Sequence, residues 1–482
     1  MTERVPAMPT RPVTAVAGES LPAPGRDRER TSRPGLSLAV AMLGFFVVAL
    51  DAQVVNVALS DIRGDLGGGL SGSQWVVTGY TLMFSALLLF GGTLSDRVGA
   101  RSAYGLGMVL FVVASIACGL ANSLGLLVVA RVVQGMGAAL VTPTSLALIR
   151  TAYDDAARRA RAISYWALGG AVAAAAGPVL GGALTEVDWR LIFVLNLPVG
   201  VLALVLLVRV GASPRRMAPF DWLGQVCAVL GLGALTYAVI EGGDHGYRST
   251  RIIIAVVVAL AAAVVFFVDQ VRARNPMVPL DLFRARPVTV ALAVGFVGMV
   301  AFYGVVFLQS LYFQQQRGLS PLQTGLLFLP MTALVAVLNP VAARTALRWG
   351  PVVPIVGGLV LMAVGLVALS LVPAGTPVLT VAMLMVPVGV GGSFTVPPGA
   401  SLIIDSIPAH RAGTASGVLN ACRQLGGSLG VAVFGATIAG ERSFSHGLRL
   451  SLLPTAALLL VTAMASLTLR GSIVARRTRS SE

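Results

Sequence analysis

The chain contains no lysine and has few charged side chains of any kind. Only 11% of its 482 residues are charged and 56% are hydrophobic, and the mean hydropathy is +0.85. A water-soluble domain carries about 25% charged residues. This chain therefore has too little polar surface to remain in water, and its composition excludes a soluble enzyme.

Cysteine and histidine are also scarce. The three cysteines, Cys118, Cys227 and Cys422, lie inside apolar runs, and none has the spacing of a disulfide framework or a metal site. The three histidines fall in predicted loops on both sides of the membrane. We therefore expect a protein that is not an enzyme, with no catalytic residues and no bound metal.

Long apolar runs are abundant. A membrane helix needs about 20 apolar residues, and the sequence contains fourteen such runs. It therefore predicts an all-α membrane protein with fourteen transmembrane helices. The runs are residues 37–59, 75–94, 103–121, 124–149, 162–184, 191–209, 220–240, 251–269, 288–310, 323–343, 352–373, 376–402, 413–439 and 451–469.

A weak internal repeat relates the two halves of the chain. The Gly-Met-Gly-Ala segment at 135–138 corresponds to Gly-Val-Gly-Gly at 389–392, and Pro143 corresponds to Pro397, at a constant offset of 254 residues. Parallel repeats of six helices are a transporter architecture. Two six-helix pseudo-repeats leave two helices over, and the runs within 220–269 fit an inserted helix pair between the halves.

The positions of arginine orient the chain in the membrane. If the N-terminus is cytoplasmic, the tails and cytoplasmic connections hold 26 arginines and the opposite side holds 7. Because cytoplasmic loops carry the excess of positive residues, we expect both termini inside a cell (inner) membrane. This asymmetry also explains the pI of about 11.1 without a nucleic-acid partner.

These predictions divide the chain into five parts. In order they are a disordered cytoplasmic tail at 1–36, an N-terminal six-helix bundle at 37–210, the inserted pair with its flanking loops at 211–287, a C-terminal six-helix bundle at 288–470 and a cytoplasmic tail at 471–482.

Asp51 is the one carboxylate that lies well inside a predicted span. It lies about 12 Å from the outer end of its helix, and Arg131 lies about 10 Å from the same face of the membrane. Gln134 follows Arg131 by three residues, on the same helix face. Burial disfavours the carboxylate, whereas a nearby guanidinium favours it, so these three residues are candidates for proton coupling. The alternative is a static ion pair that holds two helices together.

The connection between the second and third spans is a second candidate functional segment. Gly92, Asp96, Arg97, Gly99 and Arg101 lie in a short cytoplasmic turn. Glycine permits a tight turn, and a carboxylate is favoured near the start of the following helix. On the residues alone, a charged turn that obeys the positive-inside rule is preferred over a gate.

Two later spans carry unusual residues. The fifth span contains Gly177, Pro178, Gly181 and Gly182. The proline removes one backbone hydrogen bond of the helix, and the glycines let the backbone of a neighbouring helix come close. This suits either a bending helix or simple close packing. The thirteenth span places three polar residues on one face, where they line a cavity or extend toward the cytoplasm. They are Asn420, Arg423 and Gln424.

Together these segments resemble the major facilitator superfamily, in particular its fourteen-span drug:proton antiporters. Residues 50–59 are similar to the first-span motif, with a departure at Gln53, and the turn at 91–101 is similar to the gating motif. The fourth-span residues around Arg131 resemble the motif assigned to proton transfer, and residues 177–182 resemble the antiporter motif. The later stretch is similar to antibiotic exporters of the methylenomycin resistance type.

This resemblance implies proton-driven efflux of an antibiotic, secondary metabolite or similar small amphipathic molecule by alternating access. The implied partners are the drug, protons and the lipid bilayer, and no cofactor is needed besides the proton gradient. The scarcity of acids at membrane depth predicts neutral, anionic or at most monocationic substrates. Two alternatives stay open, a proton-coupled importer of a small nutrient and a non-transporting membrane protein.

Overall fold

The computed structural model describes residues 34–215, 219–373, 375–407, 411–441 and 443–469. The tails predicted at 1–36 and 471–482 lie outside the described residues, apart from Pro34, Gly35 and Leu36.

Helices and short connections make up the whole of these described ranges, and they contain no strand. The helices are α1 (Pro34–Leu66), α2 (Gly69–Val98), α3 (Ala100–Gly119), α4 (Leu124–Ala152), α5 (Ala156–Thr185), α6 (Leu191–Val194), α7 (Asn196–Leu207), α8 (Trp222–His245), α9 (Thr250–Arg272), η2 (Leu280–Arg284), α10 (Arg286–Leu311), η3 (Tyr312–Gln316), α11 (Pro321–Trp349), α12 (Val352–Ser370), α13 (Val378–Ile404), α14 (Ala412–Ala439) and α15 (Phe444–Leu467).

Twelve of these helices are long and apolar enough to cross a membrane. The prediction of an all-helical membrane protein is therefore confirmed. Two of the fourteen predicted spans are not among the twelve. One is the shorter apolar stretch Leu191–Leu207, formed by α6 and α7. The other is α14, whose mean hydropathy is lowered by Asn420, Arg423 and Gln424 in the middle of its length.

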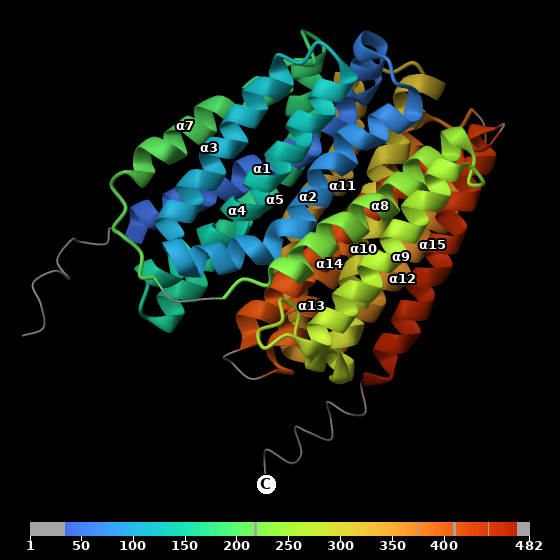
Figure 1. The fold of residues 1–482 in the computed structure, drawn as a ribbon. Helices are drawn as coiled ribbons and strands as arrows, with labels where there is room; N and C mark the ends of the chain where they lie inside the picture. Colours follow the sequence, from blue (N-terminus) through green and yellow to red (C-terminus); the bar gives the residue numbers. More distant parts are fainter. Residues whose placement is uncertain (1–33, 216–218, 374, 408–410, 442, 470–482) are drawn as a thin grey trace, which may run out of the picture.

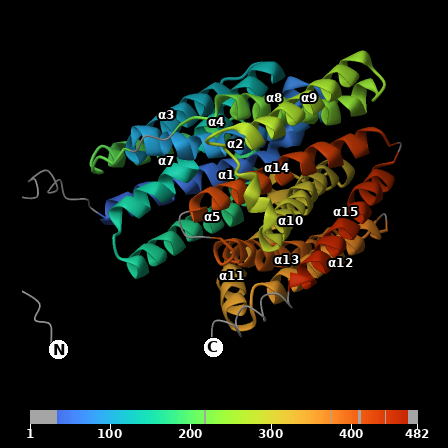
Figure 2. The same ribbon diagram turned by 60° about the horizontal axis from the view of Figure 1, so that its bottom comes forward.

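The helices form two bundles and a separate pair. Figure 1 shows the N-terminal bundle, α1–α7, in blue to green and the C-terminal bundle, α10–α15, in yellow to red. The α8–α9 pair packs against α2 of the first bundle and α14 of the second. Figure 2 shows the C-terminal bundle lying below the other helices. Its α11 packs against α5 of the first bundle, and its α14 packs against α2.

Hydrogen bonds tie the two bundles together at one end, the end at which α1 ends and α2 begins. We call this the distal end. Gln74 Nε2 donates to the carbonyl oxygen of Ala432 at 2.7 Å, and Gln314 Nε2 donates to that of Val57 at 2.8 Å. Ser310 Oγ donates to the carbonyl oxygen of Asn56 at 2.5 Å. All hydrogen bonds between the bundles in the described part of the chain lie in this half of the molecule.

Glycines bring helices within the bundles close together. A Cβ on Gly137 of α4 would lie 2.7 Å from the backbone nitrogen of Phe111 and 2.8 Å from the carbonyl oxygen of Gly107, both on α3. Such distances are below any ordinary contact, so only glycine allows this backbone approach. The helix α4 is thereby fixed against its neighbours, and its polar side chains are fixed with it.

We expect Gly137→Ala to destabilise the purified protein by about 1–3 kcal/mol, because the added methyl group overpacks the α3–α4 contact. Gly233→Ala on α8 is the matched control, since no atom lies within 4 Å of its added Cβ. Alanine has the higher helix propensity, so the control should be neutral or slightly stabilising. Thermal unfolding in detergent micelles measures both, and equal melting temperatures would contradict the packing assignment.

Candidate functional site

The site is built around an ion pair between α1 and α4. Arg131 Nη1 lies 2.5 Å from Asp51 Oδ2, and the two side chains are 1% and 0% exposed. The structure thus brings together the two charges that the sequence places at similar depth. Opposite charges in a low-dielectric interior attract strongly, and together they avoid the large cost of burying either one alone.

Neutral side chains complete the coordination of the carboxylate. Gln134 Nε2 donates to Asp51 Oδ1 at 2.9 Å, and Asn196 Nδ2 donates to the same oxygen at 2.8 Å. Both amides also donate to Ser115 Oγ, at 3.1 Å and 2.9 Å. Asp51 therefore accepts one hydrogen bond from a cation and two from amides.

The guanidinium of Arg131 is held on several sides. Its Nε donates to the carbonyl oxygen of Val76 at 3.0 Å, and its Nη1 also donates to Gln134 Oε1 at 2.7 Å. The ring of Tyr80 lies beneath it, with 4.3 Å between the ring centroid and the guanidinium carbon, and that of Phe193 lies 5.7 Å away. A cation over an aromatic face is stabilised by the ring quadrupole.

Five helices therefore converge on a site that is closed to solvent in this conformation. Asp51, Ser115, Arg131, Gln134 and Asn196 are each at most 1% exposed. The ion pair therefore has no contact with solvent in this conformation.

Sequence reasoning missed Asn196 and Ser115. Asn196 is the only polar residue between Leu191 and Leu207, inside an otherwise apolar run. An isolated polar residue at membrane depth is expensive unless it has a partner, so that position carried a detectable signal. Ser115 carried none, because a serine in a membrane helix commonly bonds to its own backbone.

The predicted gating turn is a short break between α2 and α3. Gly99 has φ of 90°, a conformation that favours glycine, and its N–H donates to the carbonyl oxygen of Ser95 at 3.0 Å. Arg101 follows at the start of α3, where its Nη2 donates to the carbonyl oxygen of Val208 at 3.0 Å. A cavity of about 510 Å³ at this point is lined by Arg101, Ser213 and Arg215, among others.

The other residues of the turn have few contacts. Asp96 is exposed and makes no hydrogen bond or ion pair with any described residue. The guanidinium carbon of Arg97 lies 5.1 Å from the ring centroid of Phe220, and a Cβ on Gly92 would have no atom within 4 Å. In this conformation Arg97 therefore contacts the loop before α8, whereas the Asp96 carboxylate has no partner among the described residues.

The glycines of α5 lie at two helix contacts. A Cβ on Gly177 would lie 2.5 Å from Gln53 Cβ, and one on Gly181 would lie 2.6 Å from the carbonyl oxygen of Val54, both on α1. A Cβ on Gly182 would lie 2.5 Å from the carbonyl oxygen of Pro321, at the start of α11 in the other bundle. Pro178 stands in the same stretch, and its carbonyl group lies against Gly325 of α11. These residues therefore allow close backbone packing within and between the bundles.

The polar residues of α14 are partly exposed in the middle of the helix. Arg423 Nη1 donates to Asn420 Oδ1 at 3.1 Å, and Gln424 follows on the next position. No group of three or more histidine, cysteine, aspartate or glutamate side chains within the described ranges is arranged to hold a metal ion.

Two helical bundles of membrane-spanning length, with an ion pair buried inside the N-terminal one, have the architecture of a multi-pass membrane transporter. The family model of the Major Facilitator Superfamily matches residues 41–431. This chain belongs to the major facilitator superfamily, which confirms the resemblance carried by its motifs.

Curated relatives are similar over most of the chain. The multidrug resistance protein Stp of Mycobacterium tuberculosis is 39% identical over 84% of this chain and 76% of its own length. The methylenomycin A resistance protein of Streptomyces coelicolor is 34% identical over 90% of this chain and 91% of its own. A solved POT family transporter in complex with 5-aminolevulinic acid shares the fold, with a TM-score of 0.69, 15% identity and coverage of 91% and 96%.

We expect Arg131→Ala to cost about 3–5 kcal/mol of stability, because it leaves Asp51 buried without its counter-ion. The double variant Asp51→Asn/Arg131→Ala removes both charges and should recover part of that loss. Arg131→Lys keeps the charge without the planar fork and should lie between wild type and Arg131→Ala.

Melting temperatures of the purified variants in one detergent check this ordering. A double variant less stable than Arg131→Ala would show that the two residues do not act as a pair.

Proposed function

We propose that this chain exports an antibiotic or similar small amphipathic molecule across the cell membrane in exchange for protons. The observation that carries the proposal is the buried Asp51–Arg131 ion pair, found in a chain whose relatives are named for multidrug and antibiotic resistance. The carboxylate is the proton-binding group, and Arg131, Gln134 and Asn196 set its environment. The proton gradient is the energy source, and no cofactor takes part.

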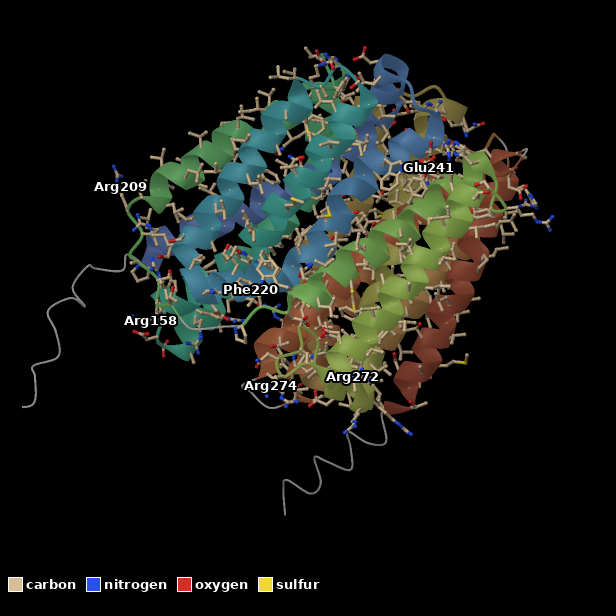
Figure 3. All side chains as sticks on the ribbon, in the orientation of Figure 1. Arg158, Arg209, Phe220, Glu241, Arg272 and Arg274 are labelled. Atoms are coloured by element: carbon tan, nitrogen blue, oxygen red, sulfur yellow. The ribbon has the colours of Figure 1, made fainter. Side chains whose placement is uncertain are left out.

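The proposed topology has fourteen spans. The stretch Leu191–Leu207 and α14 join the twelve more apolar helices, because α7 packs against α1 and α3 and α14 packs against α10. Figure 3 labels Arg158, Arg209, Arg272 and Arg274 toward the end at which α1 begins, and Glu241 at the opposite end. By the positive-inside rule the arginine-bearing end is cytoplasmic, so the distal end faces outward and both termini lie inside. Topology then accounts for the net positive charge, and no nucleic-acid partner is expected.

Alternating access gives the ion pair its role. The distal hydrogen bonds close the outer side in the conformation described here, while Asp51 is paired with Arg131. In the outward-open state an external proton would neutralise Asp51 and release Arg131 from the carboxylate. Return to the inward-facing state would restore the ion pair and deliver the proton to the cytoplasm.

The proton gradient supplies enough energy for useful export. One proton crossing a potential of 100 mV contributes about 2.3 kcal/mol. Since 1.4 kcal/mol corresponds to a factor of ten, one proton per cycle supports a drug gradient of about fiftyfold.

A proton-coupled nutrient importer is the second candidate. It would use the same Asp51 and Arg131, so the ion pair does not separate the two functions. The antiporter-like segment of α5, with Gly177 and Pro178 against α1 and α11, favours export, as do the names of the relatives. Growth of a sensitive host across antibiotic classes would identify the substrate and decide the direction.

We expect Asp51→Asn to insert and fold but to lose proton-driven efflux, because the amide keeps the shape of the side chain and cannot ionise. Efflux of a transported antibiotic from vesicles with an imposed pH gradient measures this. Asp61→Asn is the matched control, since Asp61 is an exposed acid on the same helix. Full gradient-dependent efflux by Asp51→Asn would overturn the proposed coupling.

Asp96 provides a separate test of gating. If this residue, unengaged here, helps to close the cytoplasmic side in the outward-open state, Asp96→Asn should slow turnover and leave drug binding largely intact. Turnover in vesicles and equilibrium binding to the purified protein separate the two effects. Equal loss of both would instead place Asp96 in folding or in the binding site.

A further inference from the structure

Arg423 is a second cation at membrane depth, and its environment differs from that of Arg131. It stands eleven residues after Ala412, at about 17 Å along α14. The helix packs against α10 of its own bundle and α2 of the other. Its glycines permit this position: a Cβ on Gly417 would lie 2.8 Å from Leu89 Cδ2 of α2.

The side chain of Arg423 packs against α10 of its own bundle. Its stem crosses Gly295 of α10, where a Cβ would lie 3.0 Å from Arg423 Cγ. Tyr303, on the same helix as Gly295, packs against α14 one turn further on, where a Cβ on Gly427 would lie 2.9 Å from Tyr303 Cδ2.

No described carboxylate balances this charge. Within the described ranges none of the ion pairs includes Arg423, and Asp281 is paired with Arg411 and Glu441 with His446. Asp51 is taken by Arg131. Within the described ranges, Arg423 has only the hydrogen bond from Nη1 to Asn420, and its buried Nε has no acceptor.

The unused donors have a defined geometry. Nε and Nη2 of a guanidinium lie side by side in one plane, and their two N–H groups match the two oxygens of a carboxylate. Both are free of described protein acceptors here, while Nη1 is held by Asn420. A membrane-buried cation retained without a counter-ion is a functional-site candidate.

We propose that Arg423 binds the carboxylate of the exported molecule, so that the substrates of this transporter include amphipathic organic acids. This inference rests on the proposed export function and adds its substrate class and binding residue. Asn420 orients the guanidinium, and Tyr303 supplies an aromatic surface beside it. Asp51 and Arg131 handle the proton in one bundle, while Arg423 holds the anion in the other.

The test measures binding without any proton gradient. Full-length protein in lipid nanodiscs is titrated with dansyl-phenylalanine and with its neutral amide, a fluorescent pair that differs in the carboxylate alone. We expect the acid to bind more tightly than the amide by about tenfold or more, the usual value of a hydrogen-bonded charge pair.

Substitutions at Arg423 then test whether this residue causes the preference for the acid over the amide. Arg423→Gln should bring the acid and the amide to similar affinities, and Arg423→Lys should retain part of the difference. Arg348→Gln removes an exposed arginine of the same bundle and should bind like wild type. Because the amide reports on the rest of the site, a variant that simply unfolds would lose both ligands.

The outcomes distinguish a failure of the proposed anion site from a failure of the proposed proton coupling. No binding of the acid, equal affinities in the wild type, or a preference that survives Arg423→Gln would each overturn the anion site. Efflux that ignores the pH gradient, with the carboxylate preference intact, would overturn proton coupling and leave the anion site standing.

Discussion

Neutralising one buried carboxylate is the constraint on which the rest of this structure depends. Asp51 and Arg131 must meet, because either charge alone would be unsupportable at this depth. Their meeting fixes α1 against α4, and the amides that complete the coordination bring in α7 and, through Ser115, α3. Arg131 in turn holds α2 through the carbonyl group of Val76. The arrangement of these five helices in the N-terminal bundle therefore depends on one hydrogen-bonded charge pair.

Sequence reasoning reached the charges and missed their neutral partners, for a physical reason. The depth of Asp51 and Arg131 followed from counting residues along apolar runs, because helix rise is constant. The direction of a side chain within a bundle does not follow from such counting, since buried membrane helices are apolar on all sides and show no informative periodicity. Asn196 could have been found as an isolated polar residue, whereas Ser115 could be found only from three-dimensional packing.

The number of membrane spans shows a related limit of prediction from sequence. Apolar length alone identifies most spans, but α14 is less apolar because it carries polar residues in the middle of its length, Arg423 among them. A helix that carries functional groups is less apolar than one that only faces lipid, so composition understates it. The glycines of α5 could be read from the sequence as sites of close approach. That Gly177 and Gly181 face α1 while Gly182 faces α11 needed the fold.

The distal hydrogen bonds differ from the proton site in their chemistry. Those donated by Gln74, Ser310 and Gln314 end on backbone carbonyl oxygens, and only the exposed Ser320–Glu186 contact includes an ionisable group. A closure made of amide, hydroxyl and carbonyl groups holds with the same strength in acidic and neutral surroundings. In the proposed cycle, external acidity would therefore leave these three contacts unchanged and act through the protonation of Asp51. The proton-binding group and these contacts at the outer side would then respond independently to pH, which would limit proton leakage when the outside turns acidic.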